Sequence, residues 1–284
     1  MLTPPDWVKN HVIPRLGATP VRVLAVEGLD DLKVYERWLD KLAAELNVLP
    51  SSKVLVVETA GKTRLIGGLE WLRDHAGDPA HVFGLVDRDE WTSKAAQLVK
   101  QALPRLLVNE SRHCLESYFC DPDELDAALQ SRDVANYGPE LPNLRIAIGQ
   151  ARETWVPHWA LWVTLQRAHA ELTHDGQFPN NFHGQHPLPA DAEIKRRLAA
   201  WSKTLDPKHL FTGFDQLRTS ALKRNHRRQF RECIYSKDFY PQIVKPLLLK
   251  LDPAIDPDDW PINLADWSPD VPADIRMILD PLLL

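Results

Sequence analysis

The chain has 284 residues, of which 44% are hydrophobic and 26% are charged. This composition is ordinary for a globular protein, so it excludes a wholly disordered or fibrous chain and predicts one large domain or two smaller ones. The formal net charge of −5 argues against a protein that coats nucleic acid by bulk electrostatic attraction, but it leaves a local basic patch open.

The three cysteines, Cys114, Cys120 and Cys233, form no CxxC pair and cannot make an even-numbered disulfide framework. This usage is typical of a reducing compartment. The first twenty residues lack the apolar run of a signal peptide, and no stretch reaches the ~18 apolar residues of a membrane span. We therefore expect a soluble, cytoplasmic protein with no membrane partner.

Short apolar runs alternate with helical patterns in the first half of the chain. Four runs predict buried strands, at residues 21–26, 53–58, 81–87 and 105–109. Apolar residues at intervals of three and four predict amphipathic helices over 32–46 and 65–72, and a shorter helix is expected before the fourth strand. This alternation indicates an α/β fold, with a parallel Rossmann-like sheet flanked by helices.

Beyond residue 121 the pattern changes to helices and loops, which predicts a first domain over 1–125 and a mainly helical C-terminal region over 126–284. Three tryptophans and a leucine share one helical face, which favours core packing over a base-stacking surface; they are Trp155, Trp159, Trp162 and Leu165. Residues 171–192 predict a long loop.

Charge is unevenly spread over this C-terminal region. Residues 191–240 form a basic segment with an excess of six positive charges, densest over 222–231, whereas residues 251–284 form an acidic tail with eight Asp and one Arg. The basic segment is suited to facing phosphate, but a solvated helix face with intrahelical ion pairs is an equally good interpretation. Residues 253–274 repeat Pro and Asp, and we expect them to wrap the surface, anchored by Trp260 and Trp267.

Acidic residues follow two of the predicted strands. Glu27 comes directly after the first strand, and Asp87 and Asp89 end the third. Ligands of an open parallel sheet bind outside the carboxyl ends of its strands, so these side chains are expected to converge. Carboxylate oxygens are the ligands that Mg²⁺ and Mn²⁺ prefer. A lone Asp-x-Asp is common, and acidic residues at helix starts are often caps, but the combination favours a metal site.

Other motifs fit less well. The segment over 56–63 ends like a Walker A loop, but Val56 stands where the first glycine is required, which argues against an intrinsic ATPase. A haloacid-dehalogenase-type phosphatase expects a small residue where Trp91 stands. The histidines and cysteines, including His113 and Cys114, lack convincing zinc-ligand spacing, and Cys233 is best explained as a core residue.

Glu27 in VEGLDDLKVY, with Asp87 and Asp89 in VDRD, resembles the toprim domain of topoisomerases, primases and OLD-family nucleases. The pieces TAGKTRL, NESRHCLESYFCDPDEL and IYSKDFYPQIV resemble the OLD-like branch with a DUF4435-type domain, and in particular the toprim effector nucleases of PARIS-type anti-phage systems. The resemblance covers residues 20–125 well and 230–245 thinly.

The resemblance implies a role for each matching residue. Glu27 corresponds to the toprim glutamate, a metal ligand and general acid or base, and Asp87 and Asp89 correspond to the paired metal ligands. Asp31 matches the acidic position for a second metal, with Asp30 as the alternative. Glu116 corresponds to the downstream glutamate of the OLD-like branch. Lys237 corresponds to a late lysine that is expected to stabilise charge on the phosphate. Gly61 and Lys62 correspond to a Gly-Lys turn that faces the same site.

The implied function is a Mg²⁺- or Mn²⁺-dependent nuclease, an effector of prokaryotic anti-phage defence that an ABC-type ATPase partner restrains. Its substrate is expected to be a nucleic acid, with tRNA suggested by the resemblance; the sequence does not separate RNA from DNA. Two alternatives stay open: a non-catalytic assembly subunit of an ATPase–toprim complex, and a stand-alone OLD-like DNA nuclease. A homodimer is a further candidate partner state of the active nuclease.

Overall fold

The computed structural model describes residues 3–16, 21–49, 53–88, 91, 93–174 and 191–284. In chain order its elements are η1 (Val8–Val12), η2 (Ile13–Arg15), β1 (Arg22–Val26), α1 (Leu29–Glu45), β2 (Val54–Glu58), α2 (Lys62–His75), β3 (Val82–Asp87), α3 (Ser93–Ala102), β4 (Leu106–Asn109), η4 (Leu115–Phe119), α4 (Pro122–Tyr137), α5 (Leu141–His174), α6 (Asp191–Thr204), α7 (Pro207–Leu222), α8 (His226–Glu232), α9 (Ser236–Phe239), η5 (Tyr240–Val244), α10 (Lys245–Leu251), α11 (Trp260–Trp267) and α12 (Ala273–Leu283).

The four strands form one parallel sheet in the order β2-β1-β3-β4. β1 pairs with β2 through Arg22 and Val54 and with β3 through Val23 and Val82. Each observed strand begins one residue after its predicted start and ends at the predicted residue. The α/β, Rossmann-like fold class is thereby confirmed, because the near-continuous apolar runs are what a parallel sheet covered on both faces requires.

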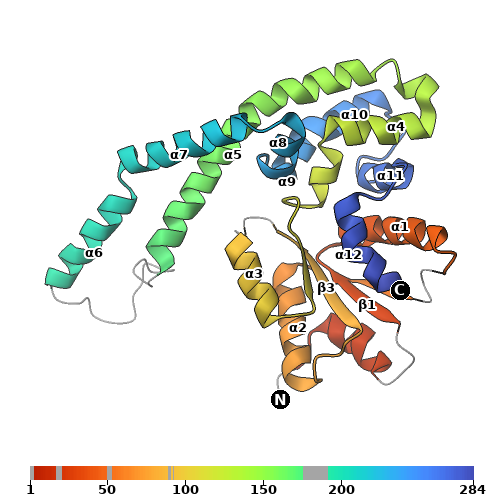
Figure 1. The fold of residues 1–284 in the computed structure, drawn as a ribbon, viewed down its shortest axis with the longest axis horizontal. Coiled ribbons are helices and arrows are strands. Elements are labelled where there is room, and N and C mark those ends of the chain that lie inside the picture. Colours follow the sequence, from red (N-terminus) through yellow and green to blue (C-terminus); the bar gives the residue numbers. More distant parts are fainter. Residues whose placement is uncertain (1–2, 17–20, 50–52, 89–90, 92, 175–190) are drawn as a thin grey trace. The chain divides into compact units, whose positions relative to one another are not determined.

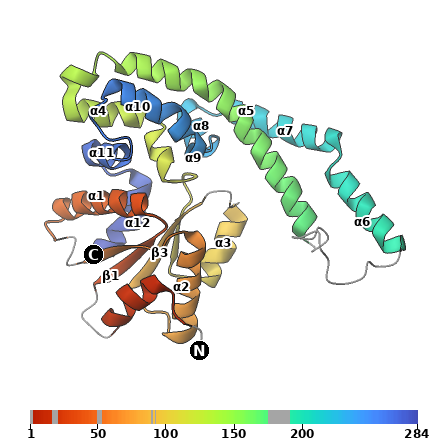
Figure 2. The ribbon, with the colours of Figure 1, turned by 180° about the vertical axis from the view of Figure 1, so that it is seen from behind.

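Helices cover both faces of the sheet. α2 and α3 lie on one face, and α1 and α12 lie on the other (Figure 1, Figure 2). Alternate residues of β1 face opposite ways, and Val23 and Ala25 join the core formed with α2. The close approach of α2 to β3 depends on Gly84, since a Cβ there would lie 2.5 Å from a methyl carbon of Leu65.

The chain divides into two compact units, one of residues 1–149 and 236–284 and the other of residues 150–235. This division differs from the predicted boundary at 125, because the C-terminal helices return to the first unit. Arg22 of β1 donates a hydrogen bond to the carbonyl of Leu282 at 3.0 Å. Arg276 of α12 forms an ion pair with Glu45 of α1 at 2.7 Å. The acidic tail is therefore part of the sheet-containing unit.

The prediction for residues 253–274 was wrong in part. This segment contains α11, although a proline stands at its second helical position, where the missing N–H costs no helical hydrogen bond. Trp260 is fully buried and anchors the segment as expected. α11 packs against α1 and α4 rather than lying as an irregular strap over the surface.

The second unit holds most of α5 together with α6, α7 and α8. The tryptophan face of α5 is not a uniform core face, because Trp162 is 50% exposed and Leu165 is 43% exposed. Thr164 and Ala168 supply the buried face instead. Most of the predicted loop over 171–192 lies outside the described residues; α5 runs to His174, and α6 begins at Asp191.

No helix in the described part of the chain is long and apolar enough to cross a bilayer. The three cysteines are free and buried, which agrees with the absence of a disulfide framework expected from their number.

Candidate active site

Glu27 and Asp87 meet at the carboxyl edge of the sheet. Glu27 directly follows β1, and Asp87 ends the neighbouring strand β3. The backbone N–H of Asp87 donates a hydrogen bond of 2.9 Å to Glu27 Oε1, although 60 residues separate the two along the chain. Asp87 is only 7% exposed, and its Oδ2 accepts a 3.1 Å hydrogen bond from the backbone N–H of Leu115. The Glu27 carboxylate is thus held against the backbone of Asp87, and the Asp87 carboxylate is held by the backbone of Leu115.

Lys62 brings a positive charge to the same edge. Its Nζ donates to the carbonyl of Asp87 at 2.6 Å and lies 3.7 Å from Glu27 Oε1. The turn before α2 directs this lysine: the Gly61 N–H donates to the Glu27 carbonyl at 2.7 Å, and Gly61 has a φ of 115°, which favours glycine. Nζ also lies 4.8 Å from the ring centre of Trp91. The Gly-Lys turn therefore contributes to the site that Glu27 opens.

Asp31 joins these groups from the first turn of α1. Its Oδ2 accepts a 2.8 Å hydrogen bond from the Gly28 N–H, as in a capping box. The pKa of Asp31 is raised to about 7: burial is the main cause, the charges of Glu27 and Glu116 add to it, and the Gly28 N–H and Lys237 oppose it. A raised carboxyl pKa of this kind marks an excess of negative charge in a partly dry site.

Glu116 and Lys237 reach the site from later parts of the chain. Glu116 lies in η4, and among the described residues its buried Oε2 has no hydrogen-bond partner. Lys237 lies in α9, and its charge acts on Asp31. The structure thus groups Glu27, Asp31, Glu116 and Lys237 in one electrostatic environment.

The candidate ligand set is only partly described. Asp89, the second predicted aspartate of the pair, lies outside the described residues. Within the described ranges, no three His, Cys, Asp or Glu side chains stand close enough together to hold a metal ion as they are. The chemistry of the donors nonetheless fits a hard divalent cation, because they are carboxylates, one of their buried oxygens is unpartnered, and the pKa of Asp31 is raised by burial and, to a smaller extent, by its acidic neighbours.

Tyr35 was not among the predicted site residues. It lies 2% exposed in α1, and burial raises the pKa of its hydroxyl well above the usual value, with added repulsion from Asp87 and Asp31. Its hydroxyl is therefore close enough to Asp87 and Asp31 to be affected by their charges. The sequence gives no signal for it, because Tyr35 occupies a position on the apolar face of the helix like its neighbours on that face.

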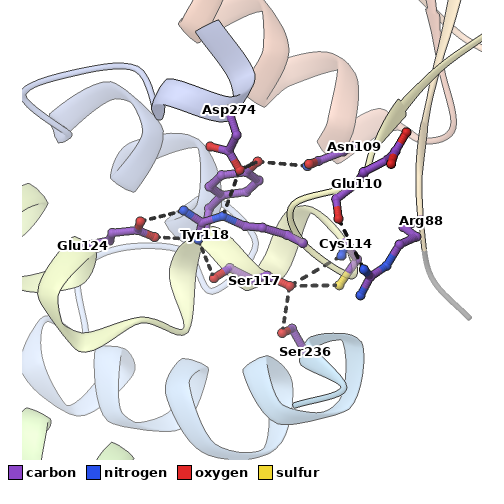
Figure 3. Close-up of polar contacts among 10 residues, drawn as sticks. Arg88, Asn109, Glu110, Cys114, Ser117, Tyr118, Glu124, Ser236 and Asp274 are labelled. Carbon is purple, nitrogen blue, oxygen red and sulfur yellow. Dashed lines mark hydrogen bonds and ion pairs between the residues drawn. The ribbon is translucent and has the colours of Figure 1, made fainter. Parts of the chain in front are cut away.

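A buried arginine network holds the segment that carries Glu116. Arg112 is fully buried, and its guanidinium pairs with Glu124 at 2.6 Å and with Asp274 at 3.4 Å. Tyr118 donates a 2.8 Å hydrogen bond to Asp274 from its hydroxyl group and accepts one of 2.9 Å from Asn109. Figure 3 shows Asp274, from α12, beside Tyr118. The network connects α4 and the segment after β4 to the C-terminal helix α12.

A second contact joins the same segment to α9. Ser117 Oγ, one residue after Glu116, is 2.9 Å from Ser236 Oγ, one residue before Lys237 (Figure 3). Since both serines are fully buried, this hydrogen bond fixes the spacing of the two charged neighbours. Sequence reasoning missed these supports, because Arg112 and Asp274 are 162 residues apart and carry no shared motif.

Comparison of the chain with protein-family models, curated proteins and solved structures found no match in any of the three.

Proposed function

We propose that this chain is a metal-dependent nuclease that hydrolyses phosphodiester bonds. The observation that carries the proposal is the meeting of Glu27, Asp87 and Lys62 at the carboxyl edge of a parallel sheet. Carboxylates beside a lysine, in a site that is partly dry, suit a reaction in which a cation bridges the protein and a phosphate. The toprim resemblance of the same residues supports the same reaction class.

Glu27, Asp31, Asp87 and Glu116 are the described side chains that would hold Mg²⁺ or Mn²⁺, with Asp89 as a further predicted ligand. The cation would activate water and stabilise the leaving oxygen. Lys62 holds the Asp87 backbone and balances the charge of Glu27, whereas Lys237 is proposed to face charge that develops on the phosphate. Glu27 is the proposed general acid or base, because it matches the toprim glutamate to which the resemblance gives this role.

The decisive experiment compares cleavage by the full-length chain and by two variants, Glu27→Gln and Asp87→Asn. Labelled tRNA and plasmid DNA are incubated with Mg²⁺ or Mn²⁺, with EDTA as the metal-free control. We expect each variant to lose about 100-fold or more of the cleavage rate, and EDTA to abolish it. The two substrates decide between RNA and DNA.

A matched control is Glu58→Gln. Glu58 is also a glutamate at the end of a strand, β2, but it is exposed and takes no part in the contacts of the site. This variant is expected to cleave as the unaltered chain does. Undiminished cleavage by Glu27→Gln would overturn the catalytic assignment.

The defence role rests on the resemblance alone. In this proposal an ABC-type ATPase binds the nuclease and restrains it until a phage trigger releases it. Co-expression with an ATPase encoded beside it is expected to give a complex that cleaves nucleic acid only after the trigger is added. Co-purification with no cleavage under any trigger would instead support the assembly-subunit alternative.

A further inference from the structure

The second unit contains a polar cavity of about 360 Å³ that plays no part in the site at the sheet. It lies where the early part of α5 meets the end of α7 and the start of α8. Its lining consists of Arg152, Glu153, Leu222, Arg224, His226 and Gln229. Two guanidinium groups and an imidazole therefore line one cavity with a single carboxylate.

Arg152 is the least satisfied of these groups. Its side chain is 12% exposed, and its buried Nη1 has no hydrogen-bond partner in the described part of the chain. Glu153 Oε1 lies 4.0 Å from Nη2, beyond hydrogen-bond distance, and the Glu153 side chain is 74% exposed. Burial lowers the pKa of Arg152, yet a guanidinium stays protonated in proteins. A buried Nη1 with no hydrogen-bond acceptor, on a guanidinium whose ion pair with Glu153 is long and exposed, favours an anion beside it.

The opposite wall of the cavity is held in place by its own hydrogen bonds. Arg224 Nη1 donates to Glu232 Oε2 at 2.6 Å, which fixes the direction of the guanidinium. Gln229 Nε2 donates to the carbonyls of Ala221, Leu222 and Arg224 at 3.1, 3.3 and 2.9 Å. These bonds close the turn between α7 and α8, so the second guanidinium is positioned before any ligand arrives.

The surrounding charge favours the same class of ligand. Residues 223–232 contain five Lys and Arg and one Glu, which makes this turn the most basic stretch of the chain. Arginine binds tetrahedral phosphate oxygens through paired N–H donors, and two guanidiniums can approach one phosphate from different sides. We propose that the cavity lined by Arg152, Arg224 and His226 is a binding site for a phosphate group.

Two sources can supply that phosphate: the backbone of a nucleic acid, or a small phosphorylated ligand. The first test uses inorganic phosphate as the probe, with the full-length chain in phosphate-free buffer containing EDTA, followed by calorimetry. Arg152→Gln is expected to weaken phosphate binding about tenfold or more, because it removes hydrogen bonds to a charged group. His226→Gln, at an exposed position, serves as a second variant that leaves the fold undisturbed and is expected to weaken binding less.

The matched control is Arg218→Gln, which removes the same charge from α7. Arg218 lies outside the cavity and pairs with Asp215 at 2.8 Å. The phosphate affinity of the Arg218→Gln variant is expected to equal that of the unaltered chain. Circular dichroism checks that each variant is folded.

The second arm measures binding of a labelled single-stranded RNA at several salt concentrations, again in EDTA. If the backbone occupies the cavity, Arg152→Gln lowers RNA affinity and reduces the slope of log affinity against log salt by about 0.7. Loss of phosphate binding with RNA binding intact assigns the cavity to a small phosphorylated ligand. Equal phosphate affinity of the unaltered chain, Arg152→Gln and His226→Gln would overturn the proposal. These readouts measure binding without metal, so they are independent of whether the chain is a nuclease.

Discussion

At the scale of single residues, the carboxylates were easier to predict than the groups that support them. Glu27 and Asp87 follow apolar strand patterns, and parallel topology brings the ends of adjacent strands together. Lys62 was predicted as part of the Gly-Lys turn that the family resemblance implies. Arg112 was not predicted, because a fully buried arginine is recognisable only from its partners, and Asp274 is remote in sequence.

Asp121 gives a residue-scale prediction about pH. It is 1% exposed at the start of α4, where its Oδ1 accepts a 3.1 Å hydrogen bond from the Asp123 N–H. Burial, together with repulsion from Glu124, raises the pKa of Asp121 to about 6. Because the folded state then holds the proton more tightly than the unfolded state, this group stabilises the fold at acid pH, and the stabilisation is lost as pH rises from about 4 to about 6.

Asp121→Asn removes this titration and keeps a good N-cap. The gain in unfolding free energy from the substitution is expected to be larger at pH 7.5 than at pH 4.5 by about 2 kcal/mol. Urea unfolding at both pH values measures it, with Asp270→Asn, at an exposed position, as the control. Equal gains at the two pH values would contradict the raised pKa.

At the scale of elements, the strands were predictable and the helix environments were not. An apolar run of four to six residues between turn signals leaves few alternatives to a buried strand, so the predicted starts of all four strands were wrong by only one residue. Periodicity shows which residues share a helix face but not what covers that face. Trp162 on α5 was therefore predicted to be in a core, although it is half exposed. α11 was missed because a proline, Pro261, stands in its first turn.

The joint between α12 and the Glu116 segment is testable as an element. Asp274→Ala removes the acceptor of the Tyr118 hydroxyl and one of the two carboxylates paired with Arg112. The unfolding free energy is expected to fall by about 2–3 kcal/mol, since buried donors are left unsatisfied. Urea unfolding measures the loss.

Asp270→Ala, an exposed change four residues earlier in the same acidic tail, is the control and is expected to alter stability by less than about 0.5 kcal/mol. A loss of the same size in both variants would show that the tail stabilises the protein through its charge rather than through the Arg112 network.

At the scale of the whole molecule, the net charge of −5 is the sum of two units that carry opposite net charges. Residues 150–235 carry 13 Lys and Arg against 8 Asp and Glu, whereas the sheet-containing unit carries 21 against 31. A polyanion is therefore attracted to the second unit and repelled by the first, unless cations neutralise the carboxylates at the sheet edge. The composition alone could not reveal this, because it averages over units that the fold separates.

The carboxylates at the sheet edge give a final prediction, which concerns metal binding. If Glu27, Asp87 and their neighbours hold Mg²⁺, the free energy of binding stabilises the folded state by about 1.4 kcal/mol at ten times the dissociation constant. The midpoint of thermal unfolding should then rise by about 3–5 °C, since that is the usual sensitivity of a unit of this size. Asp87→Asn should abolish the rise and Glu58→Gln should keep it, as measured by a thermal shift titration with Mg²⁺. A rise of the same size in Asp87→Asn would mean that the ion binds elsewhere, and that the carboxylates at the strand ends are not its ligands.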